Sequence, residues 1–162
     1  MNDRITEKMI RYFGADVRRI NHALKVFALA GCIARREKLS ENEIRIVDLA
    51  ALLHDIGIKE AEIKHNSTAG KYQEMEGPAV ARNILSAEKL DSPALDRICY
   101  IIGNHHSYSK IDSMDFQIVV EADFLVNIFE DEMPPHSIAS IREKYFKTKT
   151  GISMLESMYI GS

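Results

Sequence analysis

The stretch Leu49-Ala50-Ala51-Leu52-Leu53-His54-Asp55 carries the strongest signal in this sequence. The segment 44–53 has the pattern of a buried helix, and it ends on an imidazole and a carboxylate. Burying an unpaired carboxylate costs several kcal/mol, so buried charges are normally paired or bound to a metal ion. The stretch therefore predicts a helix that ends at a polar site inside the protein.

Three other places repeat this departure from an apolar pattern. His22 lies in the apolar stripe of a predicted helix, His105-His106 closes the apolar run 98–102, and Asp123 interrupts the run 118–128. Histidines and aspartates thus occupy several positions where hydrophobic residues are expected. Together they indicate one internal metal site.

The pattern along the rest of the chain predicts an all-α fold. Apolar residues recur at helical spacing, and no alternating pattern of useful strand length appears. A capping box at Ser40 to Glu43 opens the helix that ends at His54-Asp55, and Asp16 caps the helix before it. Segments 56–70 and 107–115 read as loops, and Gly77-Pro78 marks a break or a first turn. Helices are expected at 3–13, 17–38, 41–55, 72–89, 92–105, 116–129, 137–146 and 152–159.

Length and composition are those of an ordinary single domain. The chain has 162 residues, of which 46% are hydrophobic and 28% charged, which suits one core. A formal net charge of −3 argues against a nucleic-acid-binding surface. No apolar stretch is long enough to cross a membrane. Cys32 and Cys99 form no CxxC motif, so we expect a reducing, cytoplasmic setting.

The residues His22, His54, Asp55 and Asp123 have the composition of a divalent-metal site. Two imidazoles and two carboxylates without a thiolate suit manganese, iron, cobalt, nickel or zinc. His54 and Asp55 are adjacent, so on a helix they point about 100° apart. Both reach one ion only if it lies near the end of the helix, and the other ligands must come from separate helices.

Each of these residues also has a structural interpretation. A single histidine on an apolar stripe is more often a hydrogen-bonded core residue than a ligand. Asp123 could pair with Arg19 or Arg97, and His54-Asp55 could be a polar helix end. The metal site would be absent only if all of these structural interpretations were correct at the same time.

The ordered set His22, His54-Asp55 and Asp123 resembles the HD-domain superfamily of metal-dependent phosphohydrolases. The string Leu-Leu-His-Asp-Ile-Gly at 52–57 carries much of the resemblance, which covers about residues 16–130. It implies one domain over 1–162, with a helical metal-binding core at 16–130 and additional C-terminal helices at 137–160. It also implies hydrolysis of phosphate esters, often of nucleotides, with those four residues as ligands.

Some members of the superfamily hold a second ion through an extra histidine and a later His-His pair. His105-His106 matches the pair, whereas the extra histidine is replaced and Glu76 is the nearby candidate. Glu76 could also be an ordinary acidic residue in the first turn of a helix. The resemblance therefore implies one or two ions.

The expected chemistry is hydrolysis by a metal-activated water. Asp55 would orient the water, and His105 or His106 would neutralise charge or protonate the leaving oxygen. A phosphate also needs cationic partners, for which Arg18 and Lys59 are the candidates. Arg18 is one helical turn before His22 and so shares its face.

Two other functions remain compatible with the sequence. Some proteins of this type are di-iron oxygenases, and a non-catalytic module that binds a metal or a nucleotide would keep the same ligands. We expect a small phosphorylated molecule as the partner, with no nucleic acid or membrane. A homodimer is possible through apolar residues of either terminal helix.

Overall fold

The protein folds as an assembly of α-helices, as the sequence predicts. The structure is a computed structural model, and it describes residues 2–161. Within that range no β-strand occurs. The elements in chain order are α1 Asn2–Phe13, α2 Val17–Arg36, α3 Glu41–Leu53, α4 Ile58–His65, α5 Gly70–Leu85, α6 Ser92–Ile102, η1 Tyr108–Lys110, α7 Met114–Glu130, α8 Pro135–Tyr145, α9 Lys149–Leu155 and η2 Glu156–Ile160.

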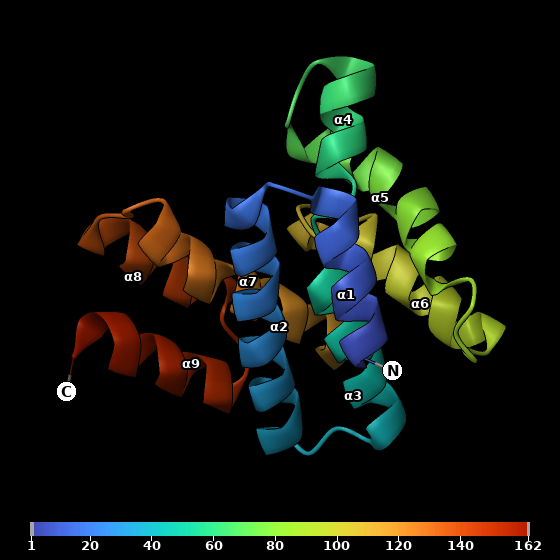
Figure 1. The fold of residues 1–162 in the computed structure, drawn as a ribbon. Coiled ribbons are helices and arrows are strands. Elements are labelled where there is room, and N and C mark those ends of the chain that lie inside the picture. The colour runs from blue at the N-terminus through green and yellow to red at the C-terminus, as the bar shows by residue number, and fades with distance from the viewer. Residues whose placement is uncertain (1, 162) are drawn as a thin grey trace.

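The centre of the fold is formed by α2, α3 and α7. Helix α2 packs against α3 and α7, and α3 also packs against α6 and α7. Helices α8 and α9 lie on one side of this centre and α5 and α6 on the other, while α4 stands at one end (Figure 1). In the described range no helix combines the length and apolarity needed to cross a membrane.

The starts of α2 and α3 follow the predicted capping residues. The Asp16 side chain accepts a hydrogen bond from the backbone N–H of Arg19, which places the start of α2. At α3, Ser40 and Glu43 form the full capping box. These bonds satisfy donors that a helix leaves unpaired at its first turn. The register of α2 and α3 is therefore set close to their starts, and with it the positions of His22 and His54.

The structure corrects several predicted boundaries. The expected loop 56–70 contains helix α4, and α5 runs unbroken through Pro78. Helix α6 ends at Ile102, three residues before the predicted end, so His105 and His106 lie in the turn that follows. Helix α7 begins at Met114, two residues before the predicted start, and Asp115 pairs with Arg97.

Candidate metal centre

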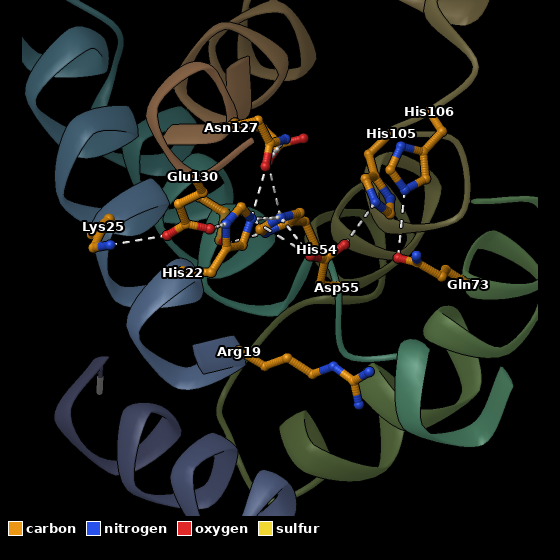
Figure 2. A network of polar contacts seen from close by, with 12 residues as sticks. Arg19, His22, Lys25, His54, Asp55, Gln73, His105, His106, Asn127 and Glu130 are labelled. Atoms are coloured by element: carbon orange, nitrogen blue, oxygen red, sulfur yellow. Dashed lines mark hydrogen bonds and ion pairs between the residues drawn. The ribbon is translucent and has the colours of Figure 1, made fainter. Parts of the chain in front are cut away.

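Three buried side chains from three helices meet inside the centre of the fold. His22 comes from α2, His54 directly follows α3 as its C-cap, and Asp123 comes from α7. His54 is fully buried, and His22 and Asp123 are 7% and 9% exposed. One donor atom from each of the three lies within 4.8 Å of the others. Figure 2 shows His22 and His54 turned toward the same point.

The two imidazoles each direct a lone pair into this group. Nδ1 of His54 lies 2.7 Å from the carbonyl oxygen of Ala51, and Nδ1 of His22 lies 2.9 Å from Oε2 of Glu130. A carbonyl and a carboxylate only accept hydrogen bonds, so Nδ1 carries the proton in both rings. The Nε2 atoms then lie 3.1 Å apart with their lone pairs facing. A cation between them removes that repulsion.

The spacing of the donor atoms fits a bound divalent ion. Oδ2 of Asp55 lies 3.5 Å from Nε2 of His22 and 3.4 Å from Nε2 of His54. Oδ1 of Asp123 lies 3.1 Å and 3.5 Å from the same nitrogens. Ligands bound at about 2.1 Å are roughly 3.0–3.4 Å apart at octahedral or tetrahedral angles. The four side chains therefore have a spacing that could hold one ion.

The electrostatics of the group also favour positive charge. Burial lowers the pKa of the His54 imidazole, but Asp55 and Asp123 outweigh it and hold that pKa well above its usual value. Burial raises the pKa of Asp123, whereas hydrogen bonds with His22 and His54 bring it well below the usual range. A divalent ion bound here would compensate both carboxylates, and the two imidazoles would bind it in their neutral form.

Asp55 also belongs to a second group. Its other oxygen, Oδ1, lies 3.2 Å from Nε2 of His105. Nδ1 of His105 lies 2.8 Å from the carbonyl oxygen of Ile102 and therefore carries the ring proton, which leaves Nε2 as the nitrogen without a proton. His106 completes a set of donor atoms within 4.8 Å of one another. Asp55 thus offers one oxygen to each group.

Close packing of the backbone fixes the turn that carries His54 and Asp55. Gly57 ends this turn and begins α4. A Cβ on Gly57 would lie 2.3 Å from the carbonyl oxygen of Gln73 and 2.5 Å from the nitrogen of Gly77. Helix α5 therefore approaches the turn as closely as a glycine permits, and any larger residue would displace the ligands.

A cleft of about 370 Å³ opens onto the first group. Arg18 is exposed there, and among residues 2–161 no carboxylate forms an ion pair with it. Arg19 instead makes two hydrogen bonds to Glu62 of α4, at 2.8 and 2.7 Å. The cleft is lined by Asp16, Arg18, Arg19, His22, Asp55, Ile58, Thr68, Asn127, Glu130 and Asp131.

Two of the predicted site residues lie elsewhere. The carboxylate of Glu76 accepts hydrogen bonds from Lys64 and His65, so it is outside both groups of donors. The ammonium of Lys59 donates to the carbonyl of Tyr12 at 2.8 Å and lies over its ring. That carbonyl is at the end of α1, where a helix attracts positive charge. Neither residue is placed to act in the cleft.

Three polar residues of the site were missed in the sequence. Glu130 and Asn127 follow Asp123 at seven and four residues along α7, and helical spacing puts all three on one face. Asn127 donates to Oδ1 of Asp123 at 2.9 Å, and Glu130 holds His22. Gln73, one turn before Glu76, contacts His106 at 3.4 Å. The periodicity around known candidates was the signal that could have found them.

The family model of the HD domain matches residues 19–143, which include both groups of donors. The chain belongs to the HD-domain family. HD domains bind divalent metal ions, and the two groups are side chains that could hold them.

A solved structure supports the same HD-type fold. The crystal structure of a predicted HD superfamily hydrolase from an uncultured Thermotogales bacterium superposes with a TM-score of 0.67 at 24% identity. The match covers 96% of this chain and 82% of that one. No curated protein matches this HD-domain chain.

Proposed function

We propose that this HD-domain protein is a metal-dependent phosphohydrolase that acts on a small phosphorylated molecule such as a nucleotide. The observation that carries the proposal is the meeting of four donor atoms, from His22, His54, Asp55 and Asp123, beside a cleft with an exposed arginine. A divalent ion held by these residues would polarise a phosphoryl oxygen and lower the pKa of a bound water. The cleft supplies space for a small substrate.

The side chains around the ion divide the remaining tasks. Asp55 is half-buried at the edge of the cleft, where its carboxylate can orient a water molecule toward the substrate. Arg18, which lines the cleft, is suited to bind the phosphoryl group, because a guanidinium matches the geometry of phosphate oxygens. Arg19 is less suited, since Glu62 and Asp16 already compensate its charge.

Elemental analysis combined with phosphate-release assays tests the proposal. We expect the purified protein to carry one or two divalent ions and to release phosphate from nucleotides or other phosphomonoesters. Asp55→Ala should lose both properties, whereas Asp3→Ala, which changes an exposed carboxylate of α1, should keep both. A wild-type protein that binds no divalent ion, or that binds ions and hydrolyses no member of a broad panel, would contradict the proposal.

The role of Arg18 has a separate test. A hydrogen bond to a charged group contributes about 1.5–3 kcal/mol, so Arg18→Ala should raise KM roughly ten- to a hundredfold. Arg36→Ala removes an exposed arginine at the far end of α2 and should leave KM unchanged. Equal KM values for wild type and Arg18→Ala would remove Arg18 from the phosphate site and leave the metal site untouched.

One feature favours a second candidate, a di-iron oxygenase. The two oxygens of Asp55 face different groups of histidines, as in a centre with two ions. The hydrolase and the oxygenase differ in what they consume. Oxygen uptake by the iron-loaded protein, without phosphate release from any substrate tested, would favour the oxygenase. Phosphate release with several divalent metals would favour the hydrolase.

A further inference from the structure

The second group of donors is held by its own set of contacts. The backbone N–H of His106 donates to Oε1 of Glu74 at 3.0 Å, and Ser107 donates to the other oxygen of that carboxylate. The ring of His106 lies against the start of α5, where a Cβ on Gly70 would be 2.7 Å from its Cδ2. Helix α5 therefore fixes the ring of His106 beside His105, 3.9 Å away between ring centres.

Gln73 adds another polar side chain to this group and lies beside His106, as Figure 2 shows. It is 7% exposed, and its Oε1 lies 3.4 Å from Nε2 of His106. Its Nε2 donates to the carbonyl of Thr68 at 2.7 Å. A carbonyl accepts only, so the NH₂ group faces Thr68 and the amide oxygen faces His106. Gln73 thus presents a fixed, buried oxygen to the second group.

The two groups differ in their donors. The first has two imidazoles, the carboxylate of Asp123 and one oxygen of Asp55. The second has two imidazoles, the other oxygen of Asp55 and a neutral amide oxygen. We propose that Gln73 is a ligand of a second ion, and that this ion binds more weakly than the first. A neutral amide attracts a cation less than a carboxylate does, and the single charge of Asp55 serves both ions.

This inference rests on the metal-dependent function proposed above, and it adds an order of loading. The ion held by His22, His54 and Asp123 fills first and stays. The ion beside Gln73 exchanges with the surrounding solution. Oxygen ligands suit hard ions such as manganese, so a second ion of that kind is expected at Gln73. Activity would then depend on the concentration of free metal.

The test is a titration of metal-free protein with Mn²⁺, followed by calorimetry and by electron paramagnetic resonance. We expect two classes of site that differ at least tenfold in affinity. Gln73→Glu should tighten the weaker class about tenfold or more, because it adds a charge at the same place. Gln73→Leu should remove the weaker class. In both variants the tight class should remain, which also shows that the protein is folded.

Glu76→Gln is the matched control. Glu76 is one turn further along α5 and points to Lys64 and His65, so this variant should titrate as wild type does. A single class of site in the wild type, or unchanged weak binding in both Gln73 variants, would overturn the inference. In the latter case Gln73 only accepts a hydrogen bond from His106.

The titration separates this inference from the proposed function. Two unequal classes with the expected response to Gln73, but no phosphate release from any substrate, would retain the inference and contradict the hydrolase. Phosphate release with one class of bound ion would retain the hydrolase and contradict the inference.

Discussion

Oε2 of Glu130 lies 2.9 Å from Nδ1 of His22 and links α7 to the ligand on α2. The other oxygen of Glu130 accepts from Lys25 at 2.9 Å. Hydrogen bonds from Lys25 and His22 outweigh burial and lower the pKa of Glu130. The carboxylate therefore stays charged, fixes the tautomer of His22 and makes the ring a stronger ligand.

Replacing Glu130 with glutamine should weaken metal binding without unfolding the protein. Loss of such a partner typically reduces metal affinity 10- to 100-fold. Competition with a metal-binding dye would measure the change for Glu130→Gln. Glu7→Gln removes an exposed carboxylate of α1 and should bind metal as wild type does. Equal affinity for Glu130→Gln and wild type would show that the bond to His22 has no part in binding.

The pair between Arg19 and Glu62 should couple α2 to α4 across the cleft. Both partners are partly exposed, at 23% and 43%, so we expect a coupling of about 0.5–1 kcal/mol despite the two-bonded geometry. A double-mutant cycle with Arg19→Ala and Glu62→Ala in chemical denaturation measures it. The coupling should fall sharply at about 1 M salt, where charges are screened within roughly 3 Å. A coupling of zero at low salt would contradict the expectation.

Adding one methyl group at Gly57 should disturb both the fold and the site. The backbone of Gly57 has φ −75°, which any residue adopts, so the effect of Gly57→Ala is steric. The new Cβ would overlap backbone atoms of α5, which cannot rotate away. We expect a loss of at least about 2 kcal/mol in unfolding free energy, together with weaker metal binding.

Gly103→Ala is the comparison for Gly57→Ala. Its Cβ would meet Pro78 Cγ at 3.0 Å and the carbonyl oxygen of Cys99 at 3.2 Å, so smaller movements suffice. The loss of stability should be smaller than for Gly57→Ala. Equal losses in the two variants would mean that the close approach of α5 to the turn at Gly57 does not determine the loss of stability.

Glu37 should contribute stability that depends on pH. Hydrogen bonds from the side chain and the backbone N–H of Thr150, both to Oε1, lower the pKa of Glu37. A carboxyl with a lower pKa in the folded state stabilises it above the unfolded pKa, and this is lost as pH falls through the folded value. Because Glu37 is only partly buried, we expect less than about 1 kcal/mol.

Urea unfolding of wild type and Glu37→Gln at about pH 7 and pH 3 measures this contribution. The wild type should be the more stable at pH 7, and the difference should shrink toward pH 3 as the Glu37 carboxylate becomes protonated. Glu41→Gln changes an exposed residue in the first turn of α3 and provides a control. A difference that stays constant with pH would contradict the expected role of the bonds from Thr150.

Sequence reasoning succeeded where a signal is local. The capping box at Ser40 and the cap at Asp16 each lie within four residues of the helix they start, and both predictions are confirmed. Buried histidines and aspartates in apolar runs likewise stand out in a single segment. The sequence therefore located the first group of donors and predicted the all-α class.

The sequence failed where stability comes from contacts between distant segments. Helix α4 has only one buried residue, Ala61, and it is held by its packing on α5 and by Lys64 and His65 on Glu76. The same contacts take Glu76 away from the donors. Helix α5 continues through Pro78 because its packing against α4 and α6 outweighs the lost hydrogen bond.

In His22, His54 and His105 a hydrogen bond fixes the proton on Nδ1, and the partners in these bonds lie at different separations along the chain. His54 and His105 bond to carbonyls three residues earlier, at Ala51 and Ile102, so four consecutive residues orient each ring. His22 bonds to Glu130, 108 residues away. Its orientation therefore lasts only while α2 and α7 remain together. On gradual heating, separation of these two helices should release the ion before α3 unwinds, so metal retention reports an early step of melting.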